Sequence, residues 1–366
     1  MNSSSNKRIG ILTGGGDCPG LNAVIRGVAK ASIGTFGMEV IGIEDGFEGL
    51  VDRRVHQLNW MNVSGILTQG GTILGTTNRG DPFHWPIATD GKDIQYADLS
   101  DHVMQYIGEL GLDALVCIGG DGTMSIAHQL NQKGIPIVGV PKTIDNDIVG
   151  TDVTFGFDSA VATATEAIDK IHSTAMSHHR AMVIEVMGRY AGWLALQSGI
   201  AGGGDVILIP EISYSLDKVS QVVYDRSKRG RQFSIIVVAE GAKPEGGDLV
   251  VQETIAGRPD PIRLGGVGQQ VAKAIELATR IETRVTVLGH LQRGGTPTAY
   301  DRVLSTRFGV AAAEAIATGN VDTMVALQGH EIVTVPLSEV GGKSRLVQPG
   351  DPLLDIARKV GTCMGN

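Results

Sequence analysis

The sequence predicts an α/β protein built on mostly parallel sheets, and three observations lead to this prediction. Short apolar runs alternate with helix-like segments along the chain, which is the pattern of strands joined by crossover helices. Glycine accounts for 51 of the 366 residues without a collagen or linker period, which indicates many tight strand-to-helix turns. The hydrophobic share of 42% beside 19% charged residues is typical of a folded protein, and the length suffices for two domains.

The strands and helices are assigned in chain order. Strands are expected at Ile9–Thr13, Glu39–Ile43, Ala114–Ile118, Ile135–Val140, Ala181–Val186, Val206–Pro210, Ser234–Ala239 and Val285–Leu288. Helices are expected at Leu21–Ala31, after the turn at 119–123, at Asp158–His172 and at Asp351–Val360. The Asp158–His172 helix is expected to link two α/β units, with a boundary near residue 155. The polar stretch Lys243–Gly268 contains Gly, Pro and mixed charge and is expected to be a surface loop.

Charge, hydropathy and cysteine content argue against several classes of protein. A formal charge of −8 and a pI of about 5.6 disfavour a nucleic-acid or membrane surface. No apolar run reaches the roughly 18 residues of a membrane span, and Met1–Ser5 lead into the first strand without a secretion signal. Cys18, Cys117 and Cys363 are odd in number and far apart, so neither a disulfide framework nor a CxxC metal site is expected. We therefore predict a cytoplasmic protein with no nucleic-acid or membrane partner.

The first glycine turn, Gly14–Asp17, lies between a predicted strand and a predicted helix. Backbone N–H groups in such a turn can bind phosphate, helped by the N-terminus of the helix. The motif departs from GxGxxG because Pro19 occupies the third glycine position, so a merely tight turn is the alternative. A Walker A motif does not fit Gly342–Ser344, because Leu337 stands where its first Gly is required. That segment is expected to be a solvated loop.

The turn Gly119–Thr123 (GGDGT) follows another apolar strand. Its glycines let the backbone approach a polyphosphate, and the carboxylate of Asp121 can hold Mg²⁺ directly or through water. The alternative is a turn with an Asp cap. Because NAD kinases and lipid kinases carry a similar motif, it indicates a phosphoryl donor without specifying the acceptor.

The segment Pro141–Asp147 (PKTIDND) places two carboxylates next to a hydroxyl. Asp145 and Asp147 are two residues apart, so an extended backbone would point both side chains the same way. One carboxylate can accept a hydroxyl proton while the other orients it or contacts metal, and Thr143 can donate to the transferred phosphoryl group. Paired Asp residues in a loop are otherwise common turn formers.

Basic residues complete the candidate site. Arg180 follows two histidines, Arg189 lies in a Met-Gly-Arg turn, and His290 and Arg293 follow an apolar strand that holds Arg284. Arginine binds phosphate in a bidentate manner, so this arrangement suits a phosphomonoester. The alternative is solvent-exposed arginine.

With these residues in place, the sequence closely resembles the 6-phosphofructokinase family. Six motifs occur in order over nearly the whole chain: GGDCPGLN within Ile9–Arg26, GGDGT, PKTIDND, EVMGRYAG (Glu185–Gly192), AEGA (Ala239–Ala242) and LGHLQRGG (Leu288–Gly295). The resemblance implies Mg²⁺-assisted phosphorylation of the 1-hydroxyl of fructose 6-phosphate to fructose 1,6-bisphosphate in glycolysis. It also implies two lobes, each a mostly parallel sheet sandwiched by helices. The larger, donor-binding lobe would comprise residues 1–155 and about 292–342, and the smaller, sugar-phosphate-binding lobe about 156–291 and 343–366.

The resemblance further implies a role for each matching residue. Asp145 would be the general base, with Thr143, Arg189 and Asp147 as the other catalytic residues. The phosphoryl donor would contact Gly15, Arg79, Gly120, Asp121, Gly122 and Thr123, with Asp121 holding Mg²⁺. Fructose 6-phosphate would contact Thr143, Asp145, Arg180, Met187, Gly188, Arg189, Glu240, Arg284, His290 and Arg293.

The resemblance also implies an allosteric homotetramer. Arg180 and Arg284 would reach into the site of a neighbouring subunit. An effector would bind near a set of residues that match the family only in part: Arg26, Lys30, His172, Asp205, Arg229 and Arg231.

The identity of the donor follows from a mixed signature. In the family, Gly after GGD marks ATP users and Lys before TIDND marks pyrophosphate users, and this chain has Gly122 and Lys142. We predict ATP, because a carboxylate at position 122 would repel the α-phosphate whereas glycine leaves room. The alternatives are a pyrophosphate-dependent enzyme, another small-molecule kinase with GGDGT, and a non-catalytic sugar-phosphate or nucleotide sensor. Arg79 is displaced by one position from the family's pattern.

Overall fold

Seven strands form the larger of the two main sheets in the computed structural model, which describes residues 7–87, 94–254 and 262–366. All neighbouring pairs are parallel except those made by the two edge strands. In spatial order the strands are β15 (Glu331–Pro336), β14 (Thr323–Gln328), β7 (Ile137–Pro141), β6 (Ala114–Gly119), β1 (Arg8–Thr13), β2 (Glu39–Ile43) and β3 (Val55–Leu58). The segment expected to precede the first strand, Met1–Ser5, lies outside the described residues.

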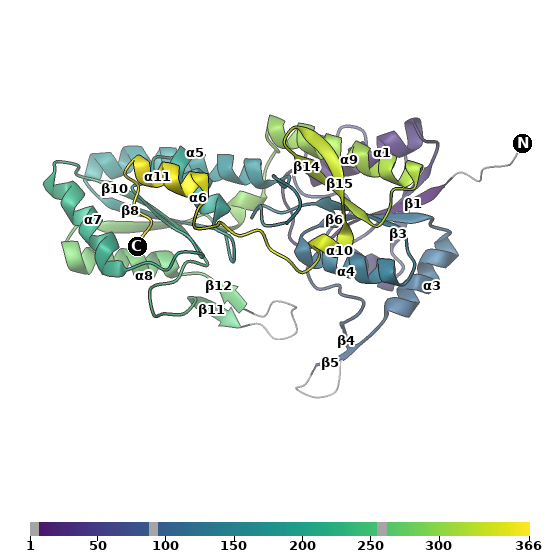
Figure 1. Cartoon of the computed structure of the whole chain (residues 1–366), viewed down its shortest axis with the longest axis horizontal. Helices are drawn as coiled ribbons and strands as arrows, with labels where there is room; N and C mark the ends of the chain where they lie inside the picture. The colour runs from purple at the N-terminus through teal and green to yellow at the C-terminus, as the bar shows by residue number, and fades with distance from the viewer. Residues whose placement is uncertain (1–6, 88–93, 255–261) are drawn as a thin grey trace, which may run out of the picture.

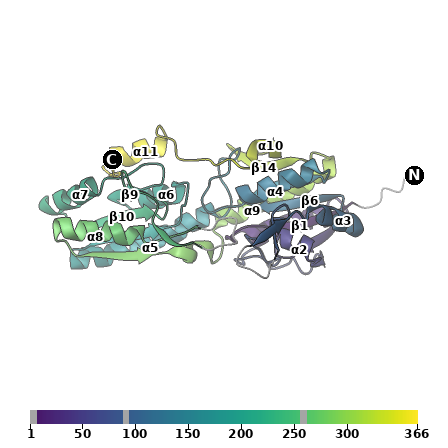
Figure 2. The same ribbon diagram turned by 90° about the horizontal axis from the view of Figure 1, so that it is seen from below.

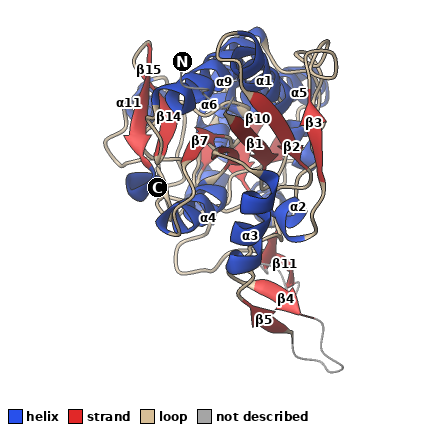
Figure 3. Cartoon of the chain, turned by 90° about the vertical axis from the view of Figure 1, so that its right-hand side faces the viewer, coloured by secondary structure: helices blue, strands red, loops and turns tan. Residues whose placement is uncertain are grey.

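Helices cover both faces of this sheet, as Figure 3 shows. One face holds α1 (Leu21–Gly34) and α9 (Ala299–Thr318), and the other holds α2 (Phe47–Val51), α3 (Ser100–Leu110), α4 (Asp121–Gln132) and α10 (Leu337–Val340). The central strands β6 and β7 are apolar on both sides because helices cover both faces of the sheet. Successive side chains of a strand point to opposite faces. In β6, Val116 and Ile118 pack in one hydrophobic cluster, and Leu115 and Cys117 pack in the other.

The smaller sheet has four strands, all parallel. Their order is β13 (Thr283–Val287), β8 (Ala181–Val186), β10 (Ser234–Ala239) and β9 (Val206–Leu208). Its helices are α5 (Phe157–His178), α6 (Trp193–Ala201), α7 (Leu216–Lys228), α8 (Val267–Thr279) and α11 (Pro352–Lys359). Figures 1 and 2 show the two sheets side by side along the long axis, with the C-terminal segment running from α10 to α11. The prediction of an α/β fold with mostly parallel sheets is therefore confirmed.

Two short hairpins differ from the sequence expectation. Residues 243–268, which were expected to be a surface loop, contain the antiparallel pair β11 (Val251–Thr254) and β12 (Ile262–Leu264). β-branched residues favour these strands, but Gly, Pro and charged neighbours obscured the pattern. A second hairpin, β4 (Trp85–Ile87) and β5 (Gln95–Ala97), projects from the body in Figure 3. Among the described residues, no helix is long and apolar enough to cross a membrane.

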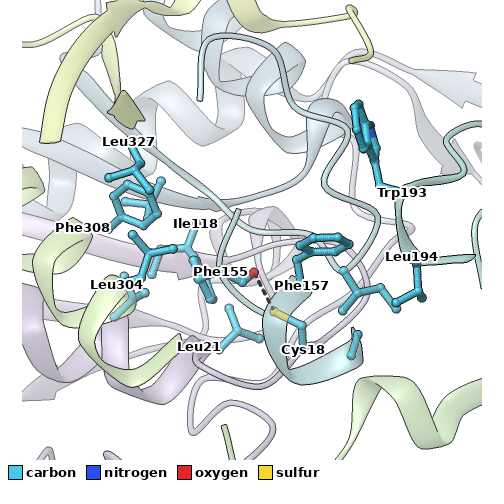
Figure 4. Packing of buried hydrophobic residues seen from close by; sticks show 14 of the residues in the cluster. Cys18, Leu21, Ile118, Phe155, Phe157, Trp193, Leu194, Leu304, Phe308 and Leu327 are labelled. Carbon is cyan, nitrogen blue, oxygen red and sulfur yellow. Dashed lines mark hydrogen bonds between the residues drawn. The ribbon is translucent and has the colours of Figure 1, made fainter. Parts of the chain in front are cut away.

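A continuous apolar cluster joins the two halves of the molecule. In Figure 4, Cys18 and Phe155 lie between Leu21 of α1 and Leu194 of α6, and the Cys18 thiol donates to the carbonyl oxygen of Phe155 at 3.7 Å. Burial raises the pKa of this thiol to about 12, so it stays protonated. The junction next to the candidate site is therefore a packed core.

Candidate active site

The loops that follow the carboxyl ends of the strands in both sheets face one another. Gly14–Asp17 follows β1, and Lys142–Asp147 follows β7. Met187–Arg189 follows β8, Glu240 follows β10, and the 3-10 helix η1 (Gly289–Arg293) follows β13. A contact between the sheets is direct, because Arg293 Nη1 donates to the carbonyl oxygen of Asp17 at 3.1 Å. Ligands of parallel α/β sheets bind at such carboxyl ends.

The two glycine turns on the larger sheet pack against one side chain, that of Thr123. A Cβ atom at Gly14 would lie 2.7 Å from Thr123 Oγ1, and a Cβ atom at Gly119 would lie 2.2 Å from it. Only glycine therefore permits this approach. Thr123 is 7% exposed, and its expected contact with the donor stays a prediction. A Cβ atom at Gly122 would meet open space.

The backbone of Gly15 and Gly16 is held by hydrogen bonds with two other parts of the chain. Lys142, which is 4% exposed, donates a short hydrogen bond from Nζ to the carbonyl oxygen of Gly16. Gly15 has a φ of +78°, and its N–H donates to the carbonyl oxygen of Thr77 at 2.9 Å. Arg79 lies two residues beyond Thr77 and is exposed, beside the first glycine turn.

The loop Thr143–Asp147 is not extended, which corrects the reasoning from spacing. Asn146 has a φ of +53°, a left-handed conformation in which successive side chains no longer alternate. Its Oδ1 accepts from the N–H of Thr154 at 3.0 Å, which stabilises that conformation. Within the loop, the Thr143 hydroxyl accepts from the N–H of Asp145 at 3.0 Å and hydrogen-bonds to the Asp147 carboxyl group. The aspartates are thus held through Thr143.

Asp145 combines a buried carboxylate with neighbouring cations. Its Oδ1 is out of contact with solvent and has no hydrogen-bond donor among the described residues. Burial raises the pKa of Asp145, Arg293 and Lys142 lower it, and Asp121 raises it again. Burial together with the charges of Asp145 and Asp121 raises the pKa of Asp147 to about 7. Asp121, Asp145 and Asp147 therefore form one acidic group at the ends of β6 and β7.

This acidic group fits a magnesium ion that is held mainly by phosphate. Asp121 begins α4 directly after the β6 turn, and its carboxylate is close enough to raise the pKa of both other aspartates. A cation there would relieve that repulsion. No cluster of three or more His, Cys, Asp or Glu able to hold a metal occurs in the part of the chain that the structure describes. Mg²⁺ in phosphoryl-transfer sites is usually held by one or two carboxylates together with substrate phosphates.

The smaller sheet supplies Met187, Gly188, Arg189 and Glu240. Gly188 has a φ of +130°, and its carbonyl oxygen accepts from the N–H of Gly241 at 3.1 Å. A Cβ atom at Gly241 would lie 1.9 Å from the carbonyl oxygen of Arg189, so these two turns touch through backbone. Burial, with Asp145 and Glu185 nearby, raises the pKa of Glu240 to about 7, and Arg293 and Arg189 oppose the rise. Glu240 and Asp145 are therefore neighbours, although they belong to different sheets.

Two of the predicted arginines do not join this group within one chain. Arg180 directly precedes β8, and Arg284 lies near the start of β13. Both pair with Glu282, with 2.9 Å between Arg180 Nη2 and Glu282 Oε1. The site lies at the other end of β8, about 20 Å away at ~3.3 Å per residue. His290 is exposed and lines an open depression with Thr163 and Leu288.

The residues of the expected effector site are also divided. Arg26 and Lys30 lie on α1, whereas Arg229 and Arg231 follow α7, and Figure 1 shows these helices at opposite ends of the molecule's long axis. Lys30 Nζ lies 4.3 Å from the centroid of the Trp60 ring. Asp205 pairs with Arg226 at 2.6 Å, and His172 Nε2 donates to the carbonyl oxygen of Gly202 at 2.7 Å.

Sequence reasoning missed several residues that support the site. Gln292 is fully buried, accepts from the N–H of Met187 at 3.3 Å and donates to the carbonyl oxygen of Gly289 at 3.0 Å. Glu185 Oε2 accepts from the N–H of Gly268 at 2.8 Å, at the start of α8. A carboxylate within an otherwise apolar strand was the available signal for Glu185.

The chain is similar to known proteins over nearly its whole length. The family model described as Phosphofructokinase matches residues 8–316. An ATP-dependent 6-phosphofructokinase of Chloroflexus aurantiacus is 52% identical, covering 100% of this chain and 99% of its own. A pyrophosphate–fructose 6-phosphate 1-phosphotransferase of Amycolatopsis mediterranei is 49% identical over 93% of this chain and 96% of its own.

A solved structure shares the fold. Phosphofructokinase from Pichia pastoris in the T-state superimposes with a TM-score of 0.78 at 33% identity and covers 92% of this chain. This chain spans 36% of that longer protein.

Proposed function

The chain belongs to the phosphofructokinase family, and on that premise we propose that it transfers the γ-phosphoryl group of ATP to the 1-hydroxyl of fructose 6-phosphate. The reaction yields fructose 1,6-bisphosphate and ADP. One observation carries the proposal: Asp145 presents a buried carboxylate oxygen without a donor among the described residues, between the glycine turns and the sugar-side residues. A buried acceptor of this kind is suited to receive a substrate hydroxyl.

The proposed chemistry divides between the two sheets. Asp145 accepts the proton of the sugar 1-hydroxyl while the oxygen of that hydroxyl forms a bond to the γ-phosphorus. The bond from that phosphorus to the β,γ-bridging oxygen breaks, and ADP leaves. Arg189 faces the developing charge, and Glu240 with Met187 orients the sugar. Asp121 and the donor phosphates would hold Mg²⁺, which would supply charge neutralisation when bound. Such catalysis rests on positioning and electrostatics.

Two observations support ATP over pyrophosphate. The space at Gly122 is open, so this position of α4 presents no side chain to a passing chain of phosphates. The ammonium group of Lys142 is bound to the carbonyl oxygen of Gly16, which makes it a support of the donor loop. Overall identity does not select the donor, because relatives named for either donor are about 50% identical to this chain.

Further properties belong to the same proposal. The chain divides into a donor lobe and a sugar lobe near residues 155, 292 and 342, which the packing of α9 on α1 and of α11 on α6 supports. Arg180 and Arg284 complete the 6-phosphate site of a neighbouring subunit in a tetramer, which their position at the end of the smaller sheet opposite to Met187–Arg189 supports. The residues of the expected effector site lie far apart in one chain, so they suit an interface between subunits of that oligomer. A regulatory ligand would bind at this interface. The enzyme would be cytoplasmic.

The test is a substrate screen with a matched pair of variants. Purified protein with Mg²⁺ is assayed with fructose 6-phosphate and either ATP or pyrophosphate, and the products are identified by ³¹P NMR. We expect fructose 1,6-bisphosphate from ATP. Asp145→Asn should lower kcat by about 10²- to 10⁴-fold while calorimetry still detects fructose 6-phosphate binding. Asp169→Asn, an exposed aspartate of α5, should behave as wild type.

Each alternative gives a different outcome. A higher kcat/KM with pyrophosphate would reverse the donor assignment within the family. Phosphorylation of a different small molecule would indicate another kinase. Binding of sugar phosphate or nucleotide without turnover would indicate a sensor. Near-normal single-turnover rates for Asp145→Asn would remove this residue from the role of base.

A further inference from the structure

The C-terminal segment between α10 and α11 touches the catalytic loop, defined here as residues 143–152. Figure 1 shows this segment crossing from the larger sheet to the smaller one. Ser344 forms an isolated antiparallel β-bridge with Ile148, and the N–H of Arg345 donates to the carbonyl oxygen of Asp147 at 2.7 Å. The side chains of Lys343 and Ser344 are exposed as expected, but the backbone that follows them is bound to the site.

The Arg345 side chain extends this contact to the middle and the C-terminal end of the loop. Its Nη1 donates to the carbonyl oxygen of Asp152 at 3.0 Å and to that of Asn146 at 3.4 Å. The guanidinium carbon lies 4.4 Å from the centroid of the Trp193 ring, and Trp193 Nε1 donates to the carbonyl oxygen of Arg345 at 2.8 Å. Arg345 is therefore fixed between the loop after β7 and the start of α6.

A second anchor holds the segment on the smaller sheet. Glu211 Oε1 accepts from the N–H of Gly192 at 3.0 Å and from the N–H of Val347 at 2.9 Å. Gly192 ends the turn that contains Met187–Arg189, so Glu211 connects the segment to the loop that presents the sugar-side residues. Because Arg345 contacts the loop that carries the base directly, the segment is a geometric link between the two halves of the site.

The catalytic loop needs such support because of its backbone conformation. The left-handed φ of Asn146 separates the directions of Asp145 and Asp147, and this conformation is uncommon outside glycine. It persists when surrounding contacts over-determine it. Arg345 binds the carbonyl oxygens of Asn146 and Asp147, which are the two peptide groups that follow this strained position.

We propose that Arg345 is a positioning residue of the phosphoryl-transfer site, which fixes the catalytic loop so that Asp145 faces the substrate hydroxyl. This inference rests on the proposed function. In this proposal the C-terminal segment affects the rate of the chemical step through the catalytic loop, and Arg345 itself contacts neither substrate. Misplacement of a reacting group by about 1 Å can cost on the order of 10²-fold in rate.

The experiment compares Arg345→Met with Lys343→Met, an exposed neighbour on the same segment. Methionine keeps an apolar stem against Trp193 and removes the donors to the loop. Rates are measured in single-turnover experiments with fructose 6-phosphate and Mg-ATP, so that product release does not limit them. We expect the Arg345→Met rate to fall about 10- to 100-fold, with KM for both substrates within about twofold of wild type. Arg345→Lys should be intermediate, because lysine restores one donor, and Lys343→Met should match wild type.

An activity-independent measurement separates this inference from the proposed function. In hydrogen exchange, Arg345→Met should raise deuterium uptake in the peptide spanning residues 143–154, whatever reaction the protein catalyses. Unchanged uptake there, or a wild-type single-turnover rate, overturns the positioning role. A raised KM with unchanged rate also overturns it, because that result would place Arg345 in substrate binding. If Arg345→Met fails to fold, Arg345→Lys decides: a wild-type rate and uptake contradict the proposal, and a reduced rate with raised uptake supports it.

Discussion

Lys142 Nζ donates a hydrogen bond to the carbonyl oxygen of Gly16, so the loop that carries Asp145 also supports the first glycine turn. Burial lowers the pKa of this ammonium group, and Arg293 lowers it further, whereas Asp17 and Asp145 raise it. The ammonium group of Lys142 is therefore bound to the backbone of the first glycine turn. Its position couples the geometry of the donor loop to that of the base.

Replacing Lys142 with methionine tests this coupling. Without the ammonium group, the carbonyl oxygen of Gly16 loses its donor and the turn that approaches the donor phosphates loses its support. We expect kcat/KM for ATP to fall by about tenfold or more, the equivalent of one charge-assisted hydrogen bond. KM for fructose 6-phosphate should change less. Steady-state kinetics with each substrate varied check this, with Lys170→Met on the surface of α5 as the control. A change confined to fructose 6-phosphate would contradict it.

The buried carboxyl group of Glu240 predicts a pH dependence of stability in the ligand-free protein. Its pKa is raised from 4.5 to about 7, so the folded state binds more protons than the unfolded state between these values. This contribution to the free energy of unfolding is fully present below pH 4.5 and is lost as the pH rises to about 7. Glu240→Gln removes it. Relative to wild type, the variant should therefore gain stability between pH 5 and pH 8, by about 1 kcal/mol or more.

Urea unfolding of both proteins at pH 5 and pH 8 measures this difference directly. Glu276→Gln, an exposed glutamate of α8, serves as the control and should show no such change. Parallel pH profiles for wild type and Glu240→Gln would mean that Glu240 is ionised throughout the range.

Much of the fold follows from local pattern, because buried parallel strands are continuous apolar runs. The predicted strand Ala181–Val186 coincides with β8, and Glu39–Ile43 coincides with β2. The short polar hairpins were missed because they have no apolar run. Within the site, the sequence motifs identified the loops that meet. The two-residue spacing of Asp145 and Asp147 wrongly predicted an extended backbone with both carboxylates pointing the same way. The conformation of Asn146 between them depends on contacts with Thr154 and Arg345, which local spacing does not encode.

Asp301 holds the start of a helix from the other half of the chain. The residue is fully buried in the first turn of α9, and it accepts from the N–H groups of Gly156 and Ser159 at 3.0 and 2.8 Å. Its Oδ2 also accepts from the Ser159 hydroxyl at 2.6 Å. In Asp301→Asn, an NH2 group replaces one of the two carboxylate oxygens, so at least one of these donors loses its acceptor. We therefore expect a loss of about 2–3 kcal/mol in the free energy of unfolding.

Urea denaturation followed by circular dichroism checks this loss. Asp158→Asn provides the comparison, because Asp158 accepts one hydrogen bond from Thr298 in the same junction and should lose less stability. Equal losses of stability in both variants would contradict the prediction that Asp301 stabilises the start of α5 more than Asp158 does.

Gly122 is the position at which we expect the choice of donor to be altered. It lies in the first turn of α4, next to Asp121, and a side chain there would enter open space. An aspartate is compatible with the first turn of a helix, so Gly122→Asp should fold. Its charge would repel the α-phosphate of ATP, whereas pyrophosphate does not extend that far. We expect kcat/KM for ATP to fall at least about tenfold and any pyrophosphate activity to rise.

Gly122→Asn, which has a side chain of similar size without charge, separates charge repulsion from steric exclusion. It should retain more ATP activity than the aspartate variant. Full ATP activity in Gly122→Asp would show that the donor phosphates do not pass this position.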